Sequence, residues 1–188
     1  MAKTPLIGMT MEELQDVCLQ LSMPKFTAKQ MAQWIYGKHV HAIDEMTNLS
    51  KGNREKLDSL FCVGCSAPLE TSRSVDGTIK YLFPTESGKF VETVYIPDGD
   101  RATLCVSCQV GCKMNCLFCQ TGKQGWQGDL TVRDILNQIY TVDQLMAQEG
   151  GTPLSNIVYM GQGEPLDNID NVLKSAEILT ADYGWAWS

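Results

Sequence analysis

The sequence predicts an α/β protein made of three parts. Short amphipathic helices fill residues 1–61, alternating apolar residues with hairpin turns occupy 62–103, and a strand, loop and helix pattern runs twice through 104–188. The chain has 188 residues, of which 44% are hydrophobic, as in ordinary globular proteins of one or two domains. It contains no run that is long and apolar enough for a signal peptide or a membrane-spanning segment.

The helices of residues 1–61 are marked by their start signals and by apolar residues at helical spacing. Thr10 followed by Glu13 has the capping-box pattern, and the first helix is expected to end near Ser22. A second helix is expected to begin near Thr27 and a third near Lys51. These residues predict a small helical domain.

Residues 69–97 are expected to form a β-meander, with a hairpin turn at Asp76-Gly77. Along its last strand, a period of two puts Glu92 in a row of apolar residues. The residues of that row are Phe90, Glu92, Val94 and Ile96. Desolvation in such a row would suit Glu92 to proton transfer near neutral pH. A solvated face is the alternative, because the opposite face of the strand is also apolar.

Two β/α units are expected after the meander. Leu104–Val110 is the first predicted strand, a helix begins at Thr131, Asn156–Met160 is the second strand, and a last helix covers about Ile169–Leu179. The loops that follow the two strands leave their C-terminal ends, where functional loops of parallel sheets lie. We therefore expect the two loops to meet on one face.

The loop after the first strand carries Cys112, Cys116 and Cys119 in the spacing C-x-x-x-C-x-x-C. Cysteine thiolates are the usual ligands of iron–sulfur clusters, and three ligands leave one iron of a four-iron cluster open for chemistry. A structural zinc site is the alternative, because the chain also holds two C-x-x-C pairs. The cysteines of these pairs are Cys62, Cys65, Cys105 and Cys108. The two pairs are further apart than those of zinc ribbons, where roughly 15 to 20 residues separate them.

Together these motifs resemble the RlmN/Cfr family of radical S-adenosyl-L-methionine (SAM) enzymes. The run from Asp100 to Cys112, then Cys119-Gln120-Thr121-Gly122, and later Gly161-Gln162-Gly163-Glu164-Pro165-Leu166 carry the resemblance. It covers essentially the whole chain but only the first half of the family's length. It implies a helix-hairpin-helix-like accessory domain at 1–61, a β-meander extension at 62–103, and the first two units of a truncated radical SAM (β/α) barrel at 104–188.

The resemblance also implies a reaction, the methylation of carbon-2 of an adenine in 23S rRNA and in tRNA. In the family, a 4Fe-4S cluster cleaves SAM, the resulting radical activates a methyl group carried by a cysteine, and the carbon radical attacks adenine. Cys112, Cys116 and Cys119 match the cluster ligands of the family.

Four further residues match functional positions of the family. Gly163 and Glu164 match SAM-binding positions, and a carboxylate suits the ammonium group of SAM, although turn geometry alone is the alternative for the glycines. Glu92 matches the base that removes the ring proton. Cys105 matches the cysteine that resolves the RNA–cysteine adduct, which implies a disulfide bond in the catalytic cycle.

Some family features are absent or altered in this chain. No residue matches the methyl-carrying cysteine, so we expect an incomplete fragment that does not finish the reaction. Cys108 stands where serine is expected, and Gly128-Asp129 replaces an Arg-Asn pair.

The net charge of −7 argues superficially against a nucleic-acid partner, and the excess acid lies in residues 62–188. From the resemblance we still expect 23S rRNA and tRNA as partners, an electron donor such as flavodoxin, a monomer, and no membrane. Free thiolates that hold a cluster need a reducing compartment, so we expect the cytoplasm. The alternatives are a radical SAM enzyme with another substrate and a zinc-stabilised nucleic-acid-binding adaptor; the helical domain either contacts RNA or is a plain packed bundle.

Overall fold

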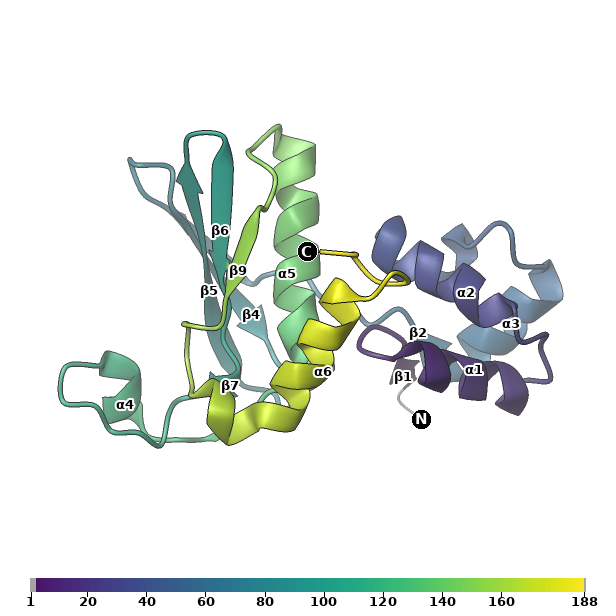
Figure 1. Ribbon diagram of the computed structural model, residues 1–188, viewed down its shortest axis with the longest axis horizontal. Coiled ribbons are helices and arrows are strands. Elements are labelled where there is room, and N and C mark those ends of the chain that lie inside the picture. Colours follow the sequence, from purple (N-terminus) through teal and green to yellow (C-terminus); the bar gives the residue numbers. More distant parts are fainter. Residues whose placement is uncertain (1–2, 188) are drawn as a thin grey trace. The chain divides into compact units, whose positions relative to one another are not determined.

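The computed structural model describes residues 3–187, which divide into two compact units. One unit contains the residues up to Cys65 together with those from Leu173 onward, and the other contains Ser66–Val172 (Figure 1). Within residues 3–187, no helix is both long enough and apolar enough to cross a membrane.

The first unit is mainly helical, as predicted. It contains α1 (Met11–Gln20), α2 (Thr27–Ala32) continued by a π-helical turn, and α3 (Lys51–Leu60). The capping box is confirmed: the Glu13 carboxylate accepts the Thr10 N–H at 2.8 Å, and the Thr10 hydroxyl accepts the Glu13 N–H at 3.4 Å. These bonds satisfy amide groups that the first helical turn leaves without intrahelical partners.

The same unit closes with a short parallel pairing of β1 (Thr4–Pro5) with β2 (Phe61–Cys62). Its core consists of apolar side chains from α1, α2 and α3 and from the connections between them. The largest of them that are fully buried are Leu6, Ile7, Leu14, Met31, Ile35, Tyr36, Met46 and Leu57.

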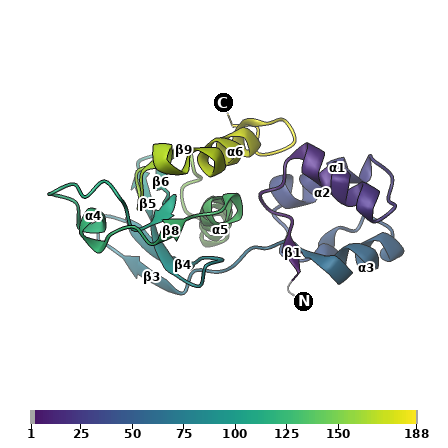
Figure 2. The same cartoon turned by 90° about the horizontal axis from the view of Figure 1, so that it is seen from below.

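The second unit is built on a five-stranded sheet in the order β3-β4-β5-β6-β9 (Figures 1 and 2). The strands are β3 (Glu70–Arg73), β4 (Ile79–Pro84), β5 (Phe90–Asp98), β6 (Arg101–Cys105) and β9 (Asn156–Val158). All neighbours are antiparallel except β6 and β9, which are parallel. The predicted meander and the two predicted parallel strands therefore share one sheet.

The predicted strand Leu104–Val110 is wrong in its extent. The sheet strand β6 ends at Cys105, and a separate two-residue strand β7 (Gln109–Val110) pairs antiparallel with β8 (Gly128–Asp129). The chain turns between them because Cys108 and Gln109 direct their N–H groups to the carbonyl of Gln162 instead of to a sheet partner.

Helix α5 (Val132–Glu149) covers one face of the sheet (Figures 1 and 2). Its predicted start is confirmed, since Thr131 and Asp134 form a capping box, and it ends at Gly150 in the left-handed conformation (φ 70°). Further helical segments are the 3-10 turn η2 (Ile43–Glu45), α4 (Gln120–Gln124), the 3-10 turn η3 (Pro165–Asn168) and α6 (Ile169–Thr180).

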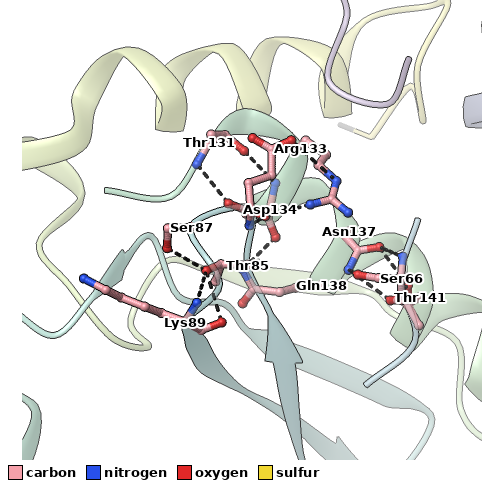
Figure 3. Close-up of polar contacts among 11 residues, drawn as sticks. Ser66, Thr85, Ser87, Lys89, Thr131, Arg133, Asp134, Asn137, Gln138 and Thr141 are labelled. Carbon is pink, nitrogen blue, oxygen red and sulfur yellow. Dashed lines mark hydrogen bonds and ion pairs between the residues drawn. The ribbon is translucent and has the colours of Figure 1, made fainter. Parts of the chain in front are cut away.

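Buried polar side chains of α5 hold neighbouring segments in place (Figure 3). The Asp134 carboxylate accepts the N–H of Glu86 at 3.1 Å, next to the β4–β5 turn. The Asn137 side chain accepts the Ser66 N–H at 2.8 Å and donates to the Ser66 carbonyl at 3.1 Å. These bonds fix α5 relative to the segment before β3 and to the β4–β5 turn, because a buried amide or carboxylate without a partner is costly.

Candidate functional site

The two loops that follow β6 and β9 meet, as the sequence predicts. The Gln162 carbonyl accepts the N–H groups of Cys108 at 2.9 Å and Gln109 at 3.1 Å, and the Gln109 side-chain carbonyl accepts the Glu164 N–H at 2.9 Å. We call residues 111–127, between β7 and β8, the cysteine loop, and residues 161–164 the glycine loop. The residues that lead into the cysteine loop, Cys108 and Gln109, are thus hydrogen-bonded directly to the glycine loop.

Gly163 makes this close approach feasible. Its φ is +103°, a conformation that favours glycine, and a Cβ at this position would lie 2.6 Å from the Gln109 Cβ. The next residue, Glu164, is half-buried, and one of its carboxylate oxygens accepts the Leu166 N–H at 3.1 Å at the start of η3. A carboxylate can accept about four hydrogen bonds, so acceptor capacity for a ligand is left.

The cysteine loop folds back on itself. Gly111 has φ +74°, and a Cβ there would lie 1.8 Å from the Gly125 carbonyl oxygen, so only glycine fits. Of the three predicted ligands, Cys112 is buried, Cys119 is half-buried and Cys116 is exposed.

The local backbone favours the ligating form of one of these thiols. The backbone N–H groups of Gly122, first, and of Thr121 lower the pKa of Cys119, which caps the short helix α4. A lowered thiol pKa increases the thiolate fraction, and the thiolate is the form that binds metals.

Within residues 3–187, no three His, Cys, Asp or Glu side chains are arranged to hold a metal ion. The three cysteines therefore share one loop but are not gathered around a common centre. The donor set still fits an iron–sulfur cluster, because it offers only thiols, from one short loop in which backbone N–H groups stabilise a thiolate. All eight cysteines are free thiols, so the structure has no disulfide bond.

Cys105 and Cys108 differ in their surroundings. Cys105, on β6, is half-buried, and burial raises its pKa. Cys108 is 1% exposed; burial, first, and the nearby acidic groups of Glu164, Cys112 and Asp129 raise its pKa to about 12. Its thiol stays protonated and packs as a small apolar group. For the zinc alternative, Cys62 and Cys65 belong to the first unit and Cys105 and Cys108 to the second.

The prediction that Glu92 lies in apolar surroundings is wrong. On β5 the buried residues are those of the opposite face, such as Val91 and Tyr95, while the Glu92 side chain is 44% exposed. Its carboxylate lies 2.9 Å from the ammonium group of Lys80 on the neighbouring strand β4. The reason is that both faces of this strand carry apolar residues, and α5 covers the face that holds Thr93, whose hydroxyl donates to Gln138.

The structure does place Glu92 and Cys105 on the same face of the sheet. Cys105 is paired directly with Val94, which is two residues from Glu92 on β5. Beside Glu92 is an open pocket of about 490 Å³. Its other lining residues are Leu82, Gly88, Lys89, Phe90, Val110, Gln124, Gln127 and Gln162. The pocket thus joins the end of the sheet to both loops.

Sequence reasoning missed the polar residues that connect these parts. Gln138 is fully buried; its carbonyl accepts the Thr93 hydroxyl at 2.6 Å and the Ser107 N–H at 2.9 Å, and its amide donates to the Ser107 carbonyl at 3.0 Å. The Ser107 hydroxyl donates to the Glu92 carbonyl at 2.5 Å and accepts the Gln162 N–H at 2.9 Å. The signal was available, because Ser107 and Gln109 are polar residues inside the predicted strand Leu104–Val110.

One known protein family matches part of the chain. The family described as "Ribosomal RNA large subunit methyltransferase N-terminal domain" matches residues 4–63. This range covers nearly all of the N-terminal helical segment.

The whole chain is similar to curated proteins. It is 57% identical to the probable dual-specificity RNA methyltransferase RlmN of Phocaeicola vulgatus, over 99% of this chain and 52% of that protein. It is 39% identical to the dual-specificity RNA methyltransferase RlmN of Alcanivorax borkumensis, over 97% of this chain and 49% of that protein. The chain spans about half the length of the curated relatives it matches.

The fold is also similar to a solved structure. The crystal structure of a radical SAM methyltransferase from Sphaerobacter thermophilus superposes with a TM-score of 0.90 and 34% sequence identity. The match covers 98% of this chain and 54% of that chain.

Proposed function

Because the chain belongs to the RlmN family, where it corresponds to the N-terminal half, we propose that it is part of a radical SAM RNA methyltransferase. The proposed substrate is an adenine of 23S rRNA and of tRNA, methylated at carbon-2. The observation that carries the proposal is the hydrogen bonding of Cys108 and Gln109, which lead into the cysteine loop, to Gln162 and Glu164 of the glycine loop, because it brings the two loops to one place.

In this proposal Cys112, Cys116 and Cys119 hold a 4Fe-4S cluster. When bound, the cluster supplies the single electron that the cleavage of SAM requires. The lowered pKa of Cys119 supports thiolate ligation, and the compact loop keeps the three thiols within eight consecutive residues. Cys116 is exposed, so it can move towards a shared centre without breaking core packing.

Gly163 and Glu164 would bind SAM. The absence of a side chain at Gly163 lets the glycine loop lie against Gln109, and the remaining acceptor sites of the neighbouring Glu164 carboxylate suit an ammonium group. Such a charge-assisted bond orients the ligand through a half-buried group, where solvent screens it less.

Glu92 would act as the base for the adenine proton. Its position in the 490 Å³ pocket supports this role, because a base must lie within reach of the substrate. Cys105 lies on the same sheet face and would resolve the RNA–cysteine adduct.

The remaining parts of the proposal concern architecture and partners. We assign the second unit to the first part of a radical SAM (β/α) barrel, with β6 and β9 as its parallel strands, and residues 1–61 to an accessory domain that contacts RNA. The electron donor would be a protein such as flavodoxin. Eight free thiols support a reducing compartment such as the cytoplasm.

The test is anaerobic reconstitution of the chain with iron and sulfide, followed by iron analysis. We expect about four irons per chain, and Cys116→Ala should abolish most of this uptake. Cys62→Ala serves as the matched control, because Cys62 lies outside the cysteine loop. Uptake of zinc instead of iron, unchanged in Cys116→Ala, would contradict the proposal and favour the zinc-stabilised adaptor.

A further inference from the structure

Gln109 is a fully buried side chain whose amide joins three segments. Its NH₂ group donates to the carboxylates of Asp129 and Asp167, both at 2.8 Å. Its carbonyl accepts the backbone N–H of Glu164 at 2.9 Å. Both amide protons and the carbonyl oxygen are therefore used, which fixes the orientation of the side chain.

The two carboxylates are connected again through the cysteine loop. The Lys113 ammonium lies 2.9 Å from the Asp167 carboxylate and 4.4 Å from the centroid of the Trp126 ring. The Trp126 indole N–H donates to the Asp129 carboxylate at 3.1 Å. We call Gln109, Asp167, Lys113, Trp126 and Asp129 the polar ring, because their contacts form a closed circuit.

The polar ring joins segments that are distant in the sequence. Lys113 directly follows the predicted ligand Cys112, Trp126 lies near the other end of the cysteine loop, and Asp167 lies three residues after Glu164. Each member is held by two others, so the circuit resists displacement of any one segment.

We propose that Gln109 is a positioning residue that sets the cysteine loop against the glycine loop. This inference rests on the proposed function, in which the cysteine loop holds the cluster and the glycine loop binds SAM. The chemistry requires an amide: glutamate at this position would put a third carboxylate beside Asp129 and Asp167, whereas the amide donates one proton to each. Because the group is buried, a lost bond is not replaced by water.

The test is hydrogen–deuterium exchange of the metal-free chain with Gln109→Glu. Amides of residues 112–128 and 161–167 should exchange about tenfold faster or more, while those of α5 stay at the wild-type rate. Gln124→Glu is the matched control, since Gln124 is an exposed glutamine of the same loop, and it should change neither segment. Adding Asp129→Asn to Gln109→Glu restores a donor–acceptor pair and should slow the exchange again.

Unchanged exchange in both loops of Gln109→Glu would overturn the inference. Equal acceleration of exchange in α5 would also overturn it, because Gln109 would then contribute only to the general stability of the fold. If Gln109→Glu does not fold, Lys113→Met opens the ring at a partly exposed residue, and it should accelerate the same two segments. The proposed function is tested separately by iron uptake and by SAM binding of the reconstituted chain. A wild-type chain that takes up no iron would contradict that function without affecting the exchange result.

Discussion

Cys108 and Cys116 are four residues to either side of Cys112, yet their side chains have different surroundings. Cys108 is 1% exposed and burial contributes most to raising its pKa to about 12, whereas Cys116 is exposed on the cysteine loop. The thiolate is the reactive form of cysteine, and a reagent must also reach it. Burial and exposure therefore separate an inert thiol from one that is available as a ligand.

This contrast predicts the pattern of alkylation. In metal-free protein at pH 8, iodoacetamide should modify Cys116 at least about 100-fold faster than Cys108. Labelling of Cys108 should become faster as the pH rises towards 11. While the pH stays below the pKa of Cys108, each unit of increase in pH raises its thiolate fraction about tenfold. Time-resolved peptide mass mapping measures both rates. Equal labelling of the two residues at pH 8 would show that Cys108 is not buried.

At the residue scale, the sequence indicated candidate residues but not their surroundings. The three thiols of the cysteine loop were proposed as ligands from their spacing, and this role stays a prediction. The sequence did not predict whether Glu92 lies on the buried or the exposed side of β5. Both faces of that strand carry apolar residues, and only the position of α5 determines which face is buried. Burial of Gln109 and Gln138 likewise depends on partners that are distant in the sequence.

At the scale of elements, local signals located the helices well. The predicted helix starts at Thr10 and Thr131 are short-range features, and the structure confirms both. The strand predicted for Leu104–Val110 failed because its end is decided by bonds to Gln162 in another loop. Boundaries that depend on distant hydrogen bonds are not encoded in a local pattern.

The glycine loop gives a prediction about close approach. Gly163→Ala should lower the free energy of unfolding by about 2 to 3 kcal/mol, from a strained backbone and from overlap with Gln109. Gly88→Ala is the matched control: its φ is also positive (74°), but a Cβ would meet no atom within 4 Å. It should cost only about 1 kcal/mol. Urea denaturation followed by circular dichroism measures both, and equal losses would contradict the close contact.

The attachment of α5 to the sheet gives a second prediction at this scale. Gln138→Met keeps the size of the side chain but leaves the Ser107 N–H and the Thr93 hydroxyl buried without this acceptor. We expect the free energy of unfolding to fall by about 3 kcal/mol.

Gln148→Met is the control for this helix, because Gln148 is exposed near the C-terminal end of α5. Its effect should stay within about 0.5 kcal/mol. Urea denaturation of the two variants measures the difference, and similar stabilities would mean that the buried network contributes little.

At the scale of the whole molecule, one sheet unites the meander with the parallel strands β6 and β9. The segments that follow the C-terminal ends of those strands lead into the two candidate loops. The sequence predicted this grouping of the loops from the general rule for parallel strands. It could not predict the strand order, which depends on pairing between segments far apart in the chain. The similarity to RlmN proteins and to a radical SAM methyltransferase extends over nearly the whole chain.

The central claim is that the cysteine loop holds a 4Fe-4S cluster and that the glycine loop binds SAM next to it. Electron paramagnetic resonance of the anaerobically reconstituted and reduced chain, recorded with and without SAM, tests it most directly. We predict the signal of a reduced 4Fe-4S cluster and a shift of that signal when SAM is added, because SAM would bind the open iron beside Glu164. A chain that gives no cluster signal and contains zinc instead would contradict the claim.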